Sequence, residues 1–214
     1  MAWPCSGEER CLAGPVGPRD LDYLAACRPA PVSAAQREAI IRTLPRQGAV
    51  TTLGSKERAK LETLAKVLRF HAREDVYDVR VVDVPQAWMG NLGRAVLLIS
   101  LPALQLLRAE QLQALVAHEI VHEYWWDAWE AARRRGDQVR LRSLEGLCDA
   151  VAALTLTALD IPAERLSSAL GAVDHFNRSR FGIPANDANY ATLRERREIV
   201  NRFSAADGSR RQSP

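Results

Sequence analysis

The chain has 214 residues, of which 47% are hydrophobic and 26% charged, so it can bury a core and is not compositionally disordered. Its formal net charge of +3 and its pI near 8.8 are too mild to indicate nucleic-acid binding, and we expect no nucleic-acid partner. No segment approaches the roughly 18 uninterrupted apolar residues of a membrane span, so we also expect no integral membrane segment.

The first segment, residues 1–33, is predicted to be an irregular leader because it is rich in Pro, Gly and Cys. It lacks the basic start and apolar stretch of a signal peptide, which makes a cytoplasmic location the default expectation. If the protein is exported, Cys5 could form a disulfide with Cys11 or Cys27, whereas in the cytosol these residues would stay thiols. The sequence leaves both locations open.

Two helices are predicted next. Ser33 is expected to cap a helix over residues 34–44, which Pro45 would end. A second helix is expected over residues 55–73, where leucines recur at helical spacing. Both helices precede a change in the hydrophobic pattern.

That change predicts a small sheet. The β-branched, partly alternating stretch 76–84 is typical of a strand, and the apolar stretch 95–100 predicts another. Residues 85–94 between them contain Pro, Asn and two Gly, and are expected to form a turn.

The remainder of the chain is predicted to be helical, and helices therefore outnumber strands, as in the α+β class. The first of these helices should end at Gly136. We expect a single domain over residues 34–203 and a flexible polar tail over residues 204–214. The predicted helices cover residues 110–135, 138–159, 163–180 and 190–203.

The stretch HEIVH lies on the first of these helices and forms an H-E-x-x-H motif. His118 and His122 are four residues apart, hence about 40° apart around a helix axis and one turn from each other. Two imidazoles in this arrangement can bind one zinc ion. Glu119 would then lie beside the ion, where a carboxylate can act as general base and acid.

The third ligand decides which class of metal site is present. The metzincin pattern needs Gly at position 125 and His at position 128, and the chain has Trp125 and Ala128 instead. A di-iron site needs two E-x-x-H pairs, and the second candidate, Glu145 to Cys148, ends in cysteine. We therefore expect neither class.

A carboxylate on the following helix is the remaining source of a third ligand. The stretch SLEGLCDAV provides Glu145 and Asp149, four residues apart on one face of a largely apolar helix. Unpaired carboxylates are costly in such surroundings, whereas metal-bound carboxylates are not. We predict one zinc ion held by His118, His122 and Glu145, with Asp149 accepting the N–H of a ligating imidazole.

These motifs resemble those of the gluzincin metallopeptidases. The upstream sequence is similar to that of the prenyl-protease and heat-shock membrane-peptidase family and its minigluzincin relatives, over about residues 75 to 200. The resemblance implies a zincin-like or minigluzincin core, with a small sheet packed on the active-site helix. The matching elements are Gln86-Ala87-Trp88, the strand Val96 to Ser100, Gln111-Leu112 and Ala117-His118-Glu119.

The resemblance also implies an activity and further site residues. The chain would be a zinc-dependent metalloendopeptidase acting on a peptide or protein substrate, with Glu119 as the catalytic base and acid. Tyr190 and Arg196 fall where the family has catalytic residues near its C-terminus. The substrate would lie along an edge strand and contact Trp88, Gly90 and Asn91.

The chain departs from the family after its second histidine. The family has small residues there, and the chain has Trp125 and Trp126; Val121 replaces the usual Gly before that histidine. Two other functions therefore stay open. One is a latent or catalytically weak metal-binding regulatory protein on the same fold, with the leader covering the cleft. The other is a structural helical domain in which the motif is accidental.

Overall fold

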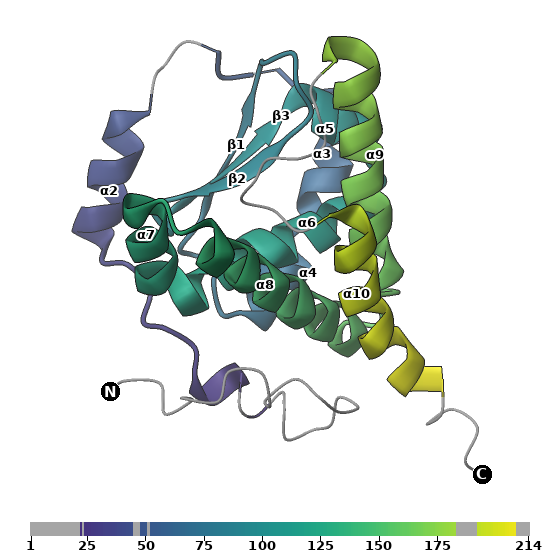
Figure 1. Ribbon diagram of the computed structural model, residues 1–214. Helices are drawn as coiled ribbons and strands as arrows, with labels where there is room; N and C mark the ends of the chain where they lie inside the picture. The colour runs from purple at the N-terminus through teal and green to yellow at the C-terminus, as the bar shows by residue number, and fades with distance from the viewer. Residues whose placement is uncertain (1–21, 23, 45–47, 51, 183–191, 209–214) are drawn as a thin grey trace.

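The computed structural model describes residues 22, 24–44, 48–50, 52–182 and 192–208. Within these parts the chain is a helix-rich α+β structure with one small sheet, as predicted (Figure 1). None of the helices in these parts is long and apolar enough to cross a membrane. Cys27 and Cys148 are free thiols, and Cys5 and Cys11 lie outside the described residues.

Helix α2 (Ala34–Thr43) confirms the first predicted helix and its cap. Ser33 accepts a hydrogen bond from the backbone N–H of Gln36, and the Gln36 side chain accepts one from the backbone N–H of Ser33. This reciprocal capping box satisfies two backbone donors that a helix start leaves without partners.

The second predicted helix is wrong as a continuous element. It divides into α3 (Ser55–Glu62) and α4 (Ala65–Phe70). At the division, the carbonyl of Thr63 accepts a hydrogen bond from Gln113 Nε2 at 2.8 Å. A distant side chain thus supplies a partner for a carbonyl at the interruption, and local periodicity does not reveal such a partner.

The sheet is three-stranded in the order β1-β3-β2. Strand β1 (Asp78–Val82) pairs in parallel with β3 (Val96–Ser100), and β2 (Met89–Leu92) pairs antiparallel with β3. The prediction of a turn throughout residues 85–94 is therefore wrong at β2. The turn between β2 and β3 consists of Gly93, Arg94 and Ala95. Gly93 and Arg94 have φ of 60° and 61°, and these positive angles suit a tight hairpin.

The predicted helix over residues 110–135 is also interrupted. It forms α6 (Ala109–Val121), a 3-10 turn η1 (His122–Trp125) and α7 (Trp126–Arg135), and it ends at Gly136 as predicted. A short helix that was not predicted, α5 (Leu101–Leu106), precedes α6. The 3-10 turn η1 contains Glu123, a charged residue that is buried. Its side chain therefore points into the protein at the place where the predicted helix is interrupted.

Three further helices complete the fold. Helices α8 (Gln138–Ala158) and α9 (Glu164–Phe181) agree with prediction to within a residue at each end, while α10 (Leu193–Gly208) continues beyond the predicted end at residue 203. Helix α6 is central, because it packs against β2 on one side and against α8 and α9 on others (Figure 1). Ten of its 13 residues are buried, so this helix forms much of the core.

Candidate metal centre

Two packed helical segments bring the predicted metal ligands together. His118 lies in the last turn of α6, and His122 begins η1 one turn later. Glu145 lies on α8, about two turns after the helix begins, and α8 packs against α6. All three side chains are buried, with exposed fractions of 4%, 9% and 3% respectively.

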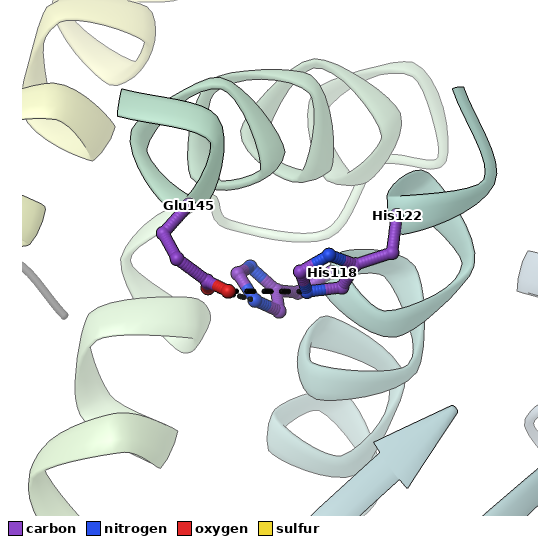
Figure 2. A group of neighbouring side chains, drawn as sticks. All are labelled: His118, His122 and Glu145. Carbon is purple, nitrogen blue, oxygen red and sulfur yellow. Dashed lines mark hydrogen bonds and ion pairs between the residues drawn. The ribbon is translucent and has the colours of Figure 1, made fainter. Parts of the chain in front are cut away.

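The three side chains point toward a common centre (Figure 2). Glu145 Oε2 lies 3.2 Å from His118 Nε2, and Glu145 Oε1 lies 3.6 Å from His122 Nε2. One ligand atom from each residue can be chosen so that all lie within 4.8 Å of one another. Ligand atoms about 2.0–2.1 Å from a shared tetrahedral ion would be about 3.3 Å apart, so this group could hold a metal ion.

Asp149 lies behind His118, one helical turn after Glu145. Its Oδ1 is 3.0 Å from His118 Nδ1, the ring nitrogen that faces away from Glu145. Arg196 on α10 donates two hydrogen bonds to the same carboxylate, at 2.6 Å each. Burial would raise the pKa of Asp149, but the hydrogen bonds from Arg196 and His118 outweigh it and lower that pKa.

The electrostatics of the group favour positive charge at its centre. Burial alone would lower the pKa of His118, yet hydrogen bonds to Asp149 and Glu145 raise it to about 10. Burial also opposes the charge of Glu145, and the hydrogen bond from His118 nevertheless keeps the pKa of Glu145 below its ordinary value. A divalent cation held by His118, His122 and Glu145 would take the place of the proton on His118 Nε2, because a ligating imidazole must be neutral.

His122 has different surroundings. Its Nδ1 lies 3.6 Å from the Sγ of Cys148, and its ring packs edge-on against Trp129 at 5.8 Å between centroids. Burial is the main cause that lowers the pKa of His122 to about 4. The imidazole is therefore neutral at physiological pH, as a metal ligand must be. Cys148 contacts the nitrogen that faces away from Glu145 and is not part of the ligand group.

Glu119 is the most accessible acidic residue at this centre. Its side chain is partly exposed, whereas Glu145 and Asp149 are buried. Desolvation is the largest cause that raises the pKa of Glu119 to about 7; the charge of Glu145 adds to it, and His118 opposes it. A carboxyl group with this pKa can both accept and release a proton near neutrality.

The residues predicted to contact substrate lie on and beside β2. Trp88 is partly exposed, and its backbone N–H and carbonyl bond to the side chain and backbone of Ser100. Gly90 pairs with Leu98 of β3. The amide nitrogen of Asn91 donates to the carbonyl of Glu119 at 2.9 Å, so Asn91 connects β2 to α6.

The two residues predicted near the C-terminus have different outcomes. Arg196 is buried on α10, and its two bonds to Asp149 make it a partner of the residue behind His118. Its Nη2 is also 3.5 Å from His118 Nδ1. Tyr190 lies outside the described residues.

A second buried polar cluster, the Glu123 cluster, lies one residue beyond His122 and was not predicted. Arg73 donates to both oxygens of Glu123 at 3.0 Å, and Tyr77 donates its hydroxyl proton at 2.7 Å. Asn91 donates to the Tyr77 oxygen at 2.7 Å, which connects the cluster to β2. These partners are far from Glu123 in sequence, so no local motif identifies them.

Comparisons with known proteins provide no family for this chain. No protein-family model matches it, and no curated protein is significantly similar to it. The metal centre is therefore inferred from the convergence of His118, His122 and Glu145. The contacts of Asp149 and Cys148 with the outer ring nitrogens of the two histidines support it.

Proposed function

We propose that the chain is a zinc-dependent metalloendopeptidase that hydrolyses peptide bonds with Glu119 as general base and acid. The observation that carries this proposal is the buried group of His118, His122 and Glu145, with Asp149 against the outer nitrogen of His118. Two histidines and one carboxylate are the ligand set of several catalytic zinc sites, which keep a further position for water or substrate. An ion bound there would polarise a substrate carbonyl and lower the pKa of a water molecule.

Glu119 is the proposed proton carrier. It follows the first ligand on α6, and it is partly exposed, so substrate and water can approach it. With a pKa of about 7, its carboxylate can take the proton from the attacking water. The same proton then passes to the nitrogen of the breaking peptide bond, which leaves as an amine while the water oxygen joins the carbonyl carbon.

Strand β2 is the proposed guide for the substrate backbone. It is at one end of the β1-β3-β2 order, and an extended peptide can pair with an end strand through main-chain hydrogen bonds. Asn91 links β2 directly to the carbonyl of Glu119. A peptide running beside Trp88 and Gly90 would therefore be held at a fixed position relative to α6.

The gluzincin resemblance agrees with this proposal. The fold would be zincin-like, with β1, β2 and β3 forming the sheet that packs on α6. Arg196 would act by holding Asp149 rather than by touching the substrate, since both of its bonds to Asp149 are short. Tyr190 keeps its proposed role in steadying the oxyanion.

The test is a peptide-library cleavage assay on zinc-loaded protein, comparing wild type with Glu119→Gln. Gln keeps the size of Glu but cannot carry the proton, so cleavage should fall by about 100-fold or more while zinc binding remains. Glu164→Gln is the matched control, because Glu164 is exposed at the start of α9.

The outcomes separate the candidate functions. Equal cleavage by wild type and Glu119→Gln would overturn the proposed role of Glu119. Zinc binding without cleavage by any variant would favour a latent or regulatory metal protein instead. Equal zinc affinity of wild type and His118→Ala would overturn the metal site and leave the motif accidental.

A further inference from the structure

We propose that Trp129 is a positioning residue that holds Glu145 in place as the third metal ligand. The inference rests on the proposed metal site and concerns a residue of α7, outside the segments that provide the ligands. Trp129 Nε1 lies 3.4 Å from Glu145 Oε1 and donates a hydrogen bond to it. The other oxygen, Oε2, faces His118 Nε2 at 3.2 Å. The two oxygens of one carboxylate therefore have different partners.

The chemistry of the indole suits this role. An indole N–H donates a hydrogen bond but has no lone pair available for a cation, so it cannot compete as a ligand. It is also neutral, so it satisfies a carboxylate oxygen without offsetting the negative charge that binds the ion. Glu145 is only 3% exposed, and its Oε1 otherwise faces only the more distant His122 Nε2 at 3.6 Å, so the indole donor matters for this oxygen.

The ring of Trp129 is held by three neighbours, so its N–H has a fixed direction. The ring of Trp126 stacks on it at 6.2 Å between centroids and 28° between planes. The guanidinium carbon of Arg133 lies 5.5 Å from the ring centroid, within the range of a cation–π contact. His122 meets the ring edge-on. One side chain thereby contacts two of the three proposed ligands, His122 by packing and Glu145 by a hydrogen bond.

Trp126 provides a matched comparison for Trp129. It lies on the same helix, has a similar partly exposed ring and takes part in the same stack. The bond to Glu145 comes from Trp129. Replacing each tryptophan by Phe therefore removes comparable apolar surface, whereas the hydrogen bond to Glu145 is removed by Trp129→Phe.

The first measurement is zinc affinity, obtained by competition with a chromophoric chelator for wild type, Trp129→Phe and Trp126→Phe. Loss of a partner that orients a ligand typically weakens metal affinity by about 10- to 100-fold, and we expect a loss in this range for Trp129→Phe. Trp126→Phe should keep the wild-type affinity. Equal affinities for Trp129→Phe and wild type would overturn the proposal.

The second measurement reports the ligand geometry itself. Cobalt(II) substitutes for zinc, and its visible absorption weakens as coordination rises above four. Without the indole, both oxygens of Glu145 are free to bind, so Trp129→Phe should show a weaker visible band than Trp126→Phe. An unchanged cobalt spectrum in Trp129→Phe would contradict the role, because a purely structural tryptophan would leave the coordination intact.

An isosteric variant guards against loss of folding. Replacing Trp129 by β-(3-benzothienyl)alanine substitutes sulfur for the N–H and keeps the ring shape, and it should reproduce the affinity loss of Trp129→Phe. Wild-type affinity in this variant would overturn the proposal while the metal site stands. Failure of the metal site is recognised separately, because wild type and His118→Ala would then bind zinc equally.

Discussion

Asp149 holds His118 from the side of the ring opposite Glu145, with Oδ1 at 3.0 Å from Nδ1. A proton on Nδ1 makes this contact a hydrogen bond to Asp149, and Nε2 faces the ligand group. Arg196 fixes the carboxylate in turn through both of its oxygens. Arg196 therefore contacts Asp149, which in turn contacts the imidazole of His118, and all three residues are buried.

Asp149→Asn should weaken zinc binding by about 10- to 100-fold, since the amide is a poorer acceptor for His118. It should also lower the free energy of unfolding by about 3–5 kcal/mol, because it removes the buried carboxylate charge that accepts two hydrogen bonds from Arg196. Chelator competition and urea unfolding measure the two effects. The control is Asp174→Asn, whose carboxylate pairs with Arg178 on the more exposed surface of α9. Wild-type zinc affinity in Asp149→Asn would contradict the assigned contact.

Glu123→Gln should destabilise the fold without acting on the metal group directly. Glu123 is 3% exposed and accepts hydrogen bonds from Arg73 and Tyr77. Removing its charge therefore leaves the buried Arg73 without its carboxylate partner. We expect a loss of about 3–5 kcal/mol, measured by urea unfolding in excess chelator. Glu130→Gln is the control, because its ion pairs with Arg133 and Arg134 are longer and the arginines are exposed. Similar losses in both variants would argue against a special role for Glu123.

The helical pattern and the ligand spacing were readable from the sequence because both depend on residues close along the chain. Helices α2, α8 and α9 follow local periodicity and caps, and His118 and His122 are one turn apart on any helix. Glu145 could be chosen as the third ligand because its helix is apolar and directly follows the helical segment of the histidines. The structure brings these three residues into one buried group.

The unpredicted features depend on partners far away in the chain. The break at η1 accompanies the pairing of Glu123 with Arg73, 50 residues earlier, and the break after α3 involves Gln113, 50 residues later. Strand β2 contains Gly90 and Asn91, which are typical of turns, yet pairing with β3 makes this stretch extended. The hydrogen bond from Trp129 to Glu145 was not predicted, because it depends on the direction that α7 takes after η1.

His71 should make the stability of the fold depend on pH in the acid range. Burial, together with the charges of Arg28 and Arg73, lowers the pKa of His71 to about 3 from the ordinary value of 6.5. Thr155 donates its hydroxyl proton to Val151 and so accepts a hydrogen bond from His71 Nε2. The unfolded chain therefore binds a proton near pH 6.5, whereas the folded chain binds it only near pH 3.

Because of this difference, the contribution of His71 to the free energy of unfolding is complete above about pH 6.5 and is lost as the pH falls toward 3. The loss is about 1.4 kcal/mol per pH unit within that window. His71→Gln should lower the free energy of unfolding at pH 7. Between pH 7 and pH 4 this free energy should then fall less steeply than in wild type (the acid limb of the pH profile), as measured by urea unfolding. His175→Gln, an exposed histidine on α9, should retain the wild-type limb. An equally steep limb in His71→Gln would contradict the assignment.

Zinc should raise the thermal stability of the protein, and chelator should lower it. An ion that binds the folded state alone stabilises it by about 2.7 kcal/mol when its free concentration is 100 times Kd. His122→Ala and Glu145→Gln should each abolish most of this shift, because each removes one of three buried ligands. Differential scanning calorimetry with zinc or with chelator measures the effect.

The matched control for this shift is His175→Ala, which removes an imidazole from an exposed position on α9 and should keep the full response to zinc. The effect of His122→Ala on the stability of the metal-free protein can be separated from its effect on the zinc response. The metal-free variant also loses the contacts of the His122 ring with Cys148 and Trp129. Its Tm in chelator should therefore be lower than that of apo wild type, and zinc should not restore it. A zinc-dependent rise in Tm of the same size in His122→Ala, Glu145→Gln and wild type would mean that the ion binds elsewhere on the protein.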